Sequence, residues 1–161
     1  MKKLIILLLL TTSSVFGQIR IPEENATLAV FLDPTATYKE SSPNIGIEFG
    51  YQGTIYAKVQ LETLPGLTGG YTSLGGAIGG NLAIGERVYI YSGVRLVPWV
   101  WRNGASNPLI GFEGGVDYNL GERFYVGIRA TYDYREDMKL LNYPVIWRGS
   151  GFLKVGYKFN L

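Results

Sequence analysis

The sequence of 161 residues contains neither cysteine nor histidine. Without cysteine, disulfides cannot stabilise the chain and a lipid anchor cannot be attached to a cysteine thiol. Without histidine, the side chain that most often acts as a general base near neutral pH is missing. A Ser-Lys pair is an alternative catalytic arrangement, but the serines lie in glycine-rich or loop contexts with no distinctive lysine spacing. We therefore expect a protein that is not an enzyme and needs no cofactor.

The chain also lacks an excess of charge and a long apolar run. Lysine and arginine number 15 against 13 acids, and the two signs are interspersed, whereas nucleic-acid binding requires a concentrated basic face. The apolar run from Leu4 to Leu10 is shorter than the ~20 residues that span a bilayer. Because Lys2 and Lys3 precede this run and small residues follow it, residues 1–17 are predicted to be a secretory signal peptide cleaved near Gly17. Residues 18–161 are predicted to form one domain.

Most of the chain alternates between apolar and polar residues. From Phe124 to Tyr134, for example, the apolar side chains occupy every second position, which is typical of a β-strand with two different faces. Two segments show the alternation less clearly: residues 71–83 are rich in glycine, and residues 27–38 are interrupted by Pro34. Pro98 follows the segment 88–96. Both prolines conflict with a regular strand, because each removes a hydrogen bond between strands. The conflict leaves two solutions open, a bulge or a shorter strand. Eight strands are predicted, at residues 27–38, 44–51, 55–62, 71–83, 88–96, 110–120, 124–134 and 153–161.

The sequence Gly-Glu-Arg occurs twice, at residues 85–87 and 121–123, each time between two predicted strands. Together with Gln52-Gly53 these segments are predicted to be tight turns in which glycine supplies a positive φ. Longer connections separate them, at 39–43, 63–69, 102–107 and 135–147. Alternating short and long connections are typical of an antiparallel meander, so an all-β, eight-stranded up-and-down barrel is predicted.

The charged residues of the strands share the polar face. Placed on lipid, an arginine or lysine at mid-depth costs about 2–4 kcal/mol, whereas in a narrow lumen six acids and five bases can pair. Aromatic residues at the strand ends would form two interfacial girdles, Tyr51, Tyr118, Phe124 and Phe159 near the short turns and Tyr38, Trp99, Trp101, Tyr134 and Trp147 near the long loops. A transmembrane barrel is therefore favoured. The predicted lumen charges are Asp33, Glu48, Lys58, Glu62, Arg95, Glu113, Asp117, Arg129, Asp133, Lys154 and Lys158.

The last segment, "GFLKVGYKFNL", resembles the C-terminal assembly signal of small eight-stranded outer-membrane barrels of the OmpA and OmpX type. The signal residues would be Tyr157, Phe159 and Leu161, although the final residue is Leu161 where that family usually ends in an aromatic. The resemblance implies a bacterial outer-membrane location, with both termini in the periplasm and the longer loops outside. It also implies outer-membrane lipid and the barrel-insertion machinery as partners. Barrels of this kind that are enzymes rely on a histidine, which this chain lacks.

Three further motifs carry weaker hypotheses. The glycines from Gly75 to Asn81 are not followed by Gly-Lys-Ser/Thr, so a phosphate loop is disfavoured and relief of crowding is preferred. Glu136 and Asp137 form too small an acidic group to predict a metal site. The longest loop is unusually apolar. It is either folded onto the membrane interface or over the barrel mouth, or it is a contact surface for an extracellular partner. Its candidate contact residues are Met138, Leu140, Leu141, Tyr143 and Trp147.

The function predicted from the sequence is thus that of an outer-membrane barrel with a structural or surface-interaction role and no wide pore. Two alternatives remain open. One is a soluble, exported, lipocalin-like barrel that binds a small apolar ligand, in which Arg95, Arg129 and Lys154 would be accessible on the outer wall. The other is a narrow pore for small solutes.

Overall fold

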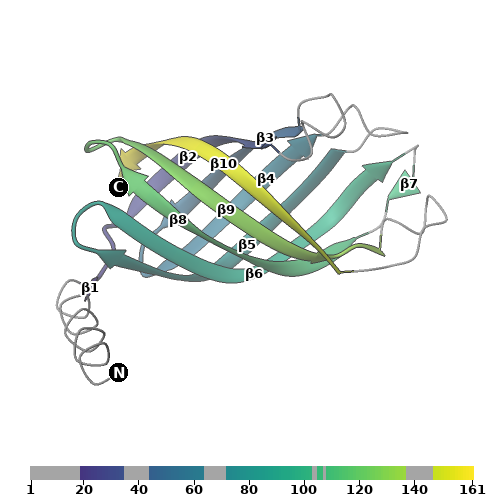
Figure 1. The fold of residues 1–161 in the computed structure, drawn as a ribbon, viewed down its shortest axis with the longest axis horizontal. Coiled ribbons are helices and arrows are strands. Elements are labelled where there is room, and N and C mark those ends of the chain that lie inside the picture. Colours follow the sequence, from purple (N-terminus) through teal and green to yellow (C-terminus); the bar gives the residue numbers. More distant parts are fainter. Residues whose placement is uncertain (1–18, 35–43, 64–71, 103–104, 107, 137–146) are drawn as a thin grey trace, which may run out of the picture.

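A computed structural model describes residues 19–34, 44–63, 72–102, 105–106, 108–136 and 147–161. These residues form a closed antiparallel β-barrel (Figure 1), which confirms the predicted all-β fold. The strands of the barrel wall are β2 (Asn25–Asp33), β3 (Asn44–Gln52), β4 (Ile55–Thr63), β5 (Thr72–Ile84), β6 (Val88–Arg102), β8 (Leu109–Asn119), β9 (Phe124–Tyr134) and β10 (Trp147–Asn160). Two further strands, β1 (Ile19–Arg20) and β7 (Ala105–Ser106), have two residues each.

Each wall strand pairs with the next wall strand along the chain, and the pairing of β2 with β10 closes the ring. Strand β5 joins β6 through the short turn, while the first wall strand β2 pairs with the last, β10, over Leu153↔Leu32 to Asn160↔Asn25. The wall therefore has no free edge along most of its length, as a membrane-spanning sheet requires.

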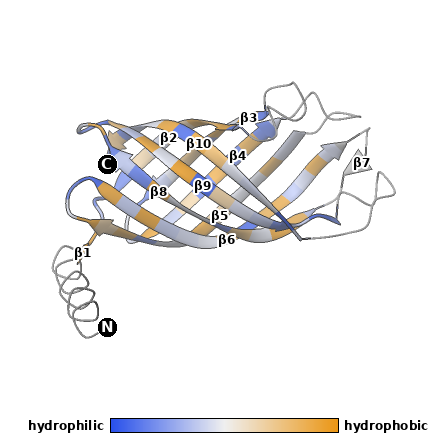
Figure 2. Ribbon diagram, viewed as in Figure 1, coloured by the Kyte–Doolittle hydropathy of each residue, from blue (hydrophilic) through white to orange (hydrophobic). Residues whose placement is uncertain are grey.

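The period of two seen in the sequence is the period of burial in the structure. In β3, Glu48 is only 3% exposed, whereas the flanking Ile47 and Phe49 are 49% and 59% exposed on the outer wall. Figure 2 shows the same alternation of hydropathy along the strands of the barrel. The outer wall is thus apolar and the interior is polar, which is the arrangement of a barrel whose outer wall faces the hydrocarbon core of a membrane.

The short turns and the longer connections lie at opposite ends of the barrel. The turns 53–54, 85–87 and 120–123 share one end with the start of β2 and the end of β10 (Figure 1). The predicted positive φ is correct only for Gly85, whose φ is +63°; Gly53 and Gly121 form their turns without it. The predicted connection 39–43 falls outside the described residues, as does nearly all of 63–69.

The two prolines are accommodated in different ways. Strand β2 ends at Asp33, so Pro34 lies just beyond it and the predicted strand over 27–38 is too long within its described part. Pro98 lies inside β6, where the register with β5 shifts between Leu74 and Gly76. One residue, Gly75, therefore faces two, Val97 and Pro98, which is a β-bulge. One conflict is resolved by a shorter strand and the other by a bulge.

Strand β1 was not predicted from the sequence. It pairs with the end of β5, Ile19↔Ile84 and Arg20↔Ala83, where β4 no longer contacts β5 because their pairing ends at Gly80. The chain then runs along the rim to the start of β2, so β1 covers the last stretch of exposed edge. Among the residues that the structure describes, no helix is long and apolar enough to cross a membrane.

Candidate functional site

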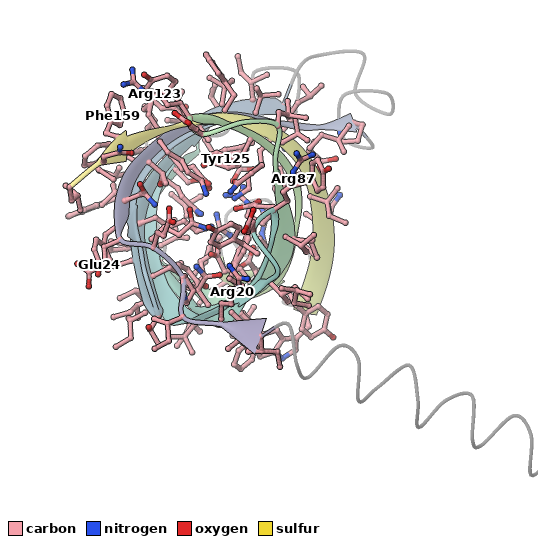
Figure 3. All side chains as sticks on the ribbon, turned by 90° about the vertical axis from the view of Figure 1, so that its left-hand side faces the viewer. Arg20, Glu24, Arg87, Arg123, Tyr125 and Phe159 are labelled. Carbon is pink, nitrogen blue, oxygen red and sulfur yellow. The ribbon has the colours of Figure 1, made fainter. Side chains whose placement is uncertain are left out.

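The candidate site is the barrel lumen, where the charged residues of the strands converge. The ten lumen residues predicted as a charge network all face inward, and so does Asp33. Their relative exposures are 2–5%, apart from Lys58, whose side chain is 7% exposed. Figure 3, viewed from the short-turn end, shows polar side chains filling the ring. The alternative of a soluble barrel with an apolar lumen is therefore wrong, because Arg95, Arg129 and Lys154 are buried inside.

Glu48 is the centre of the network. Its carboxylate is contacted by Lys154 Nζ at 3.1 Å, by an Nη of Arg129 at 3.1 Å and by Lys58 Nζ at 3.5 Å. The two lysines have second partners, since Lys58 lies 2.8 Å from Glu113 and Lys154 lies 2.9 Å from Asp117. Three acids and three bases from five strands are thus joined in one cluster, which compensates for their removal from water.

Gln60 connects this cluster to a second one nearer the long-loop end. Its amide nitrogen donates to Glu113 at 3.1 Å and to Glu48 at 3.4 Å, and its amide oxygen accepts from Arg95 Nε at 3.2 Å. Arg95 in turn pairs with Asp133 at 2.5 Å and with Glu62 at 3.3 Å. Because both ends of the amide are used, the two clusters form one continuous hydrogen-bonded network.

Aromatic rings fix the positions of the buried cations. The Arg129 guanidinium contacts the rings of Phe31 and Phe152, 4.0 and 4.3 Å from their centroids, and these two rings also pack edge to face against each other. Lys58 and Lys154 both face the ring of Tyr91, at 4.5 and 4.6 Å. Phe31 and Phe152 were not among the predicted site residues. The sequence could have indicated them, because residues two positions apart in a strand share a face. Phe31 is two positions from Asp33, and Phe152 is two positions from Lys154.

Lys158 differs from the other lumen cations. Its Nζ lies 4.0 Å from the centroid of Tyr89, and within the described part of the chain no carboxylate lies within ion-pair distance of it. The ring of Tyr125 is 5.8 Å away. A cation facing aromatic rings gains a weaker stabilisation than one in a buried ion pair. The structure therefore places Lys158 in the lumen but not in the ion-pair network.

The two halves of the lumen are packed differently. Toward the long loops, apolar side chains that are at most 2% exposed fill the interior, namely Phe31, Val97, Val100 and Leu109. Toward the short turns lies a cavity of about 30 Å³, bordered by polar groups that include Gln52, Asn81 and Asp117. This volume is enough for about two water molecules. This cavity among the described residues is too small for a metabolite.

The other predicted site residues lie at the two ends of the barrel. Tyr157, Phe159 and Leu161 are placed at the short-turn end, with Phe159 45% and Leu161 77% exposed. Of the candidate contact loop, Met138, Leu140, Leu141 and Tyr143 lie outside the described residues. Trp147 belongs to β10 rather than to the loop, and its ring stacks on Tyr132 with centroids 5.1 Å apart. The roles predicted for both groups stay predictions.

The predicted aromatic girdles are present where the residues are described. Tyr51, Tyr118 and Phe124 are exposed near the short turns, as are Trp99 and Trp101 near the long loops. Tyr134 and Trp147 also belong to the long-loop girdle, whereas Tyr38 lies outside the described residues. Among the residues described, no group of three or more acidic side chains is arranged to hold a metal ion.

Comparison with known proteins agrees with this architecture. No family model matches the sequence, and comparison with curated proteins found no match. Solved structures do match. The outer membrane protein Ail of Yersinia pestis has 13% identity and a TM-score of 0.55, over 85% of this chain and all of that one. Neisserial surface protein A has 14% identity and a TM-score of 0.53, over 88% of this chain and 99% of that one. The chain thus has the fold of small outer-membrane barrels, which confirms the fold inferred from the resemblance.

Proposed function

We propose that the protein is a non-enzymatic barrel of the bacterial outer membrane that is closed to solutes and acts structurally or through surface interactions of its long-loop end. The observation that carries this proposal is the division between the two faces of the wall. The outer face is apolar on every wall strand and has an aromatic girdle at each end, whereas the inner face carries eleven charged side chains that are almost fully buried.

The closed lumen supports an interaction role over a transport role. A solute would have to pass Arg129, which contacts two phenylalanine rings and is paired with Glu48. It would also have to pass the apolar side chains Val97 and Val100, which are 1% and 0% exposed. An eight-stranded barrel has an interior just large enough for its own side chains. Recognition therefore belongs to the surfaces at the ends of the barrel.

Two measurements test the proposal. In the first, cells that make the protein are fractionated, and the membrane fraction is run on a denaturing gel with and without boiling. We expect the protein in the outer membrane and a band that shifts on boiling, because a folded barrel binds less detergent than the unfolded chain. In the second, the purified barrel is added to a planar lipid bilayer, where we expect no discrete conductance steps.

Each of the two measurements has an outcome that would contradict the proposal. Recovery of the full-length protein in the soluble periplasmic fraction, with no heat-dependent shift, contradicts the membrane assignment. Discrete conductance steps from a homogeneous sample contradict the closed lumen and favour the narrow pore. The variant Arg129→Ala serves as a comparison in the bilayer experiment, because it removes one of the side chains that fill the lumen, the one in contact with Phe31 and Phe152.

A further inference from the structure

The repeated Gly-Glu-Arg turns have the same side-chain arrangement. In the first, an Nη of Arg87 donates to the hydroxyl of Tyr118 at 3.4 Å; in the second, an Nη of Arg123 donates to that of Tyr157 at 3.0 Å. The register explains the likeness, because the residue after each arginine pairs with that tyrosine, Val88↔Tyr118 and Phe124↔Tyr157. The remaining short turn, Gly53-Thr54, contains no arginine. The repeat is therefore a side-chain motif as well as a turn motif.

Both arginines lie outside the ring, at the level where the apolar wall ends. Arg87 and Arg123 are exposed, Arg87 contacts the outward-facing Tyr118, and Figure 3 shows Arg123 outside the ring on the same side of the wall as Phe159. Below Arg123 lies a cluster of rings in which Tyr157 is 5.1 Å from Phe124 and 4.9 Å from Phe159. Tyr118, the partner of Arg87, is itself 41% exposed. Each guanidinium is thus held at the border between a polar rim and an apolar wall.

The chemistry of this border selects a ligand. A guanidinium has five N–H donors in a planar fork, the tyrosine hydroxyl accepts from one of them, and the fork matches the paired oxygens of a phosphate group. A free phosphate would make no use of the exposed rings, whereas a phospholipid places its tails along them. Each turn also carries a glutamate beside the arginine, so a headgroup with both signs, such as phosphoethanolamine, fits better than a purely anionic one. In the first turn this glutamate, Glu86, also forms an exposed ion pair with Arg20, with the two charged groups 3.4 Å apart.

We propose that each Gly-Glu-Arg turn binds the phosphodiester of one phospholipid in the leaflet at the short-turn end, through Arg87 in one site and Arg123 in the other. Tyr118 and Tyr157 are positioning residues that hold the guanidinium toward the headgroup. This proposal rests on the membrane location proposed above. It accounts for a repeat that the turn conformation alone does not explain, because Gly121 forms its turn without the positive φ of Gly85.

The experiment is native mass spectrometry of the folded barrel in detergent, titrated with phosphatidylethanolamine. We expect two tightly retained lipids on the unmodified protein, one on Arg123→Gln and none on the double variant Arg87→Gln/Arg123→Gln. Loss of one charged contact should weaken each site about tenfold, which corresponds to about 1.4 kcal/mol. Tyr157→Phe keeps the charge and the ring but frees the guanidinium, so we expect about threefold weaker retention at one site. Arg148→Gln, at an exposed arginine near the long-loop end, is the matched control.

Equal lipid retention by the double variant and the unmodified protein overturns the proposal. So does displacement of the retained lipid by millimolar inorganic phosphate, which would identify a free-anion site. The heat-dependent gel shift of each variant separates this result from the proposed function. If the double variant keeps the shift and loses the lipids, the headgroup sites are supported. If the unmodified protein has no shift, the membrane assignment itself fails.

Discussion

Glu48→Gln tests the lumen network at its centre. The substitution keeps the shape of the side chain and removes one negative charge that three cations share. Lys58 and Lys154 retain their shorter contacts, at 2.8 Å to Glu113 and 2.9 Å to Asp117. Arg129 is different, because within the described residues its ion-pair partner is Glu48 alone. The variant therefore leaves one buried guanidinium without a partner at ion-pair distance among the described residues.

The magnitude follows from this difference. Removing one partner of a buried ion pair costs about 3–5 kcal/mol, because the remaining charge stays out of water. The rings of Phe31 and Phe152, which both contact Arg129, stabilise the cation whether or not Glu48 is present. We therefore expect a loss near the lower limit, about 3 kcal/mol in the free energy of unfolding. A second substitution, Arg129→Met, is then combined with Glu48→Gln. It removes the unpaired positive charge and keeps an apolar side chain against the two rings.

The assay is urea unfolding of the barrel in lipid vesicles, followed by tryptophan fluorescence, with the gel shift as a second probe. We expect Glu48→Gln to lower the midpoint strongly and Glu48→Gln/Arg129→Met to recover much of the loss. Glu86→Gln removes an ion pair whose side chains are 62% and 80% exposed, so it should leave the midpoint unchanged. A loss below about 1 kcal/mol for Glu48→Gln, no larger than that of an exposed pair, would refute the reasoning.

Three further predictions use the same unfolding assay. Val155→Arg, at a wall position that is 59% exposed, should cost about 2–4 kcal/mol, because the charge faces lipid. In the same strand, a side chain at Gly156 would overlap a lumen ring, whereas nothing lies within 4 Å of one at Gly151. Gly156→Ala should therefore destabilise by about 1–3 kcal/mol and Gly151→Ala should not. Gly85→Ala should cost about 1 kcal/mol through its positive φ, and Gly121→Ala should be neutral or slightly stabilising.

Each of these pairs has an outcome that contradicts it. A neutral Val155→Arg would mean that the outer wall faces water. Equal effects of the two alanines in β10 would mean that lumen packing does not limit side-chain size at Gly156. Equal effects in the two Gly-Glu-Arg turns would mean that their glycines share one backbone conformation, contrary to the φ of +63° found only at Gly85 among the described glycines.

The division of the wall into two faces could be predicted from the sequence because a strand has a period of two. Once Phe49 faces lipid, Glu48 has to face the lumen, and the same parity places Lys154 and Arg129 inside. The network also required the strands to be in register, which the tight turns fix locally. The set of charged residues in the lumen could therefore be predicted from alternation and turn length alone. Which acid pairs with which base could not be predicted in this way.

Features that depend on contacts between distant segments were not accessible in this way. Pro98 and Pro34 read alike in the sequence, but only Pro98 lies where a bulge keeps β6 paired with β5. The bulge also changes the parity of β6, so Trp99 faces outward and Val100 inward. Strand β1 forms because β5 extends beyond β4, a difference in strand length that local pattern does not encode. In each case the local structure depends on how far, and in which register, the neighbouring strand is paired.

The packing of the lumen also bears on where the protein can act. A path through the barrel would have to separate Arg129 from Glu48 and displace Phe31 or Phe152, and these contacts share one guanidinium. Separating a buried charge pair and opening the ring packing around it would therefore have to occur together, so their free-energy costs add. The two ends of the barrel carry no such penalty. The short-turn rim presents exposed arginines beside exposed rings, and the proposed function therefore assigns binding to the rims rather than to the lumen.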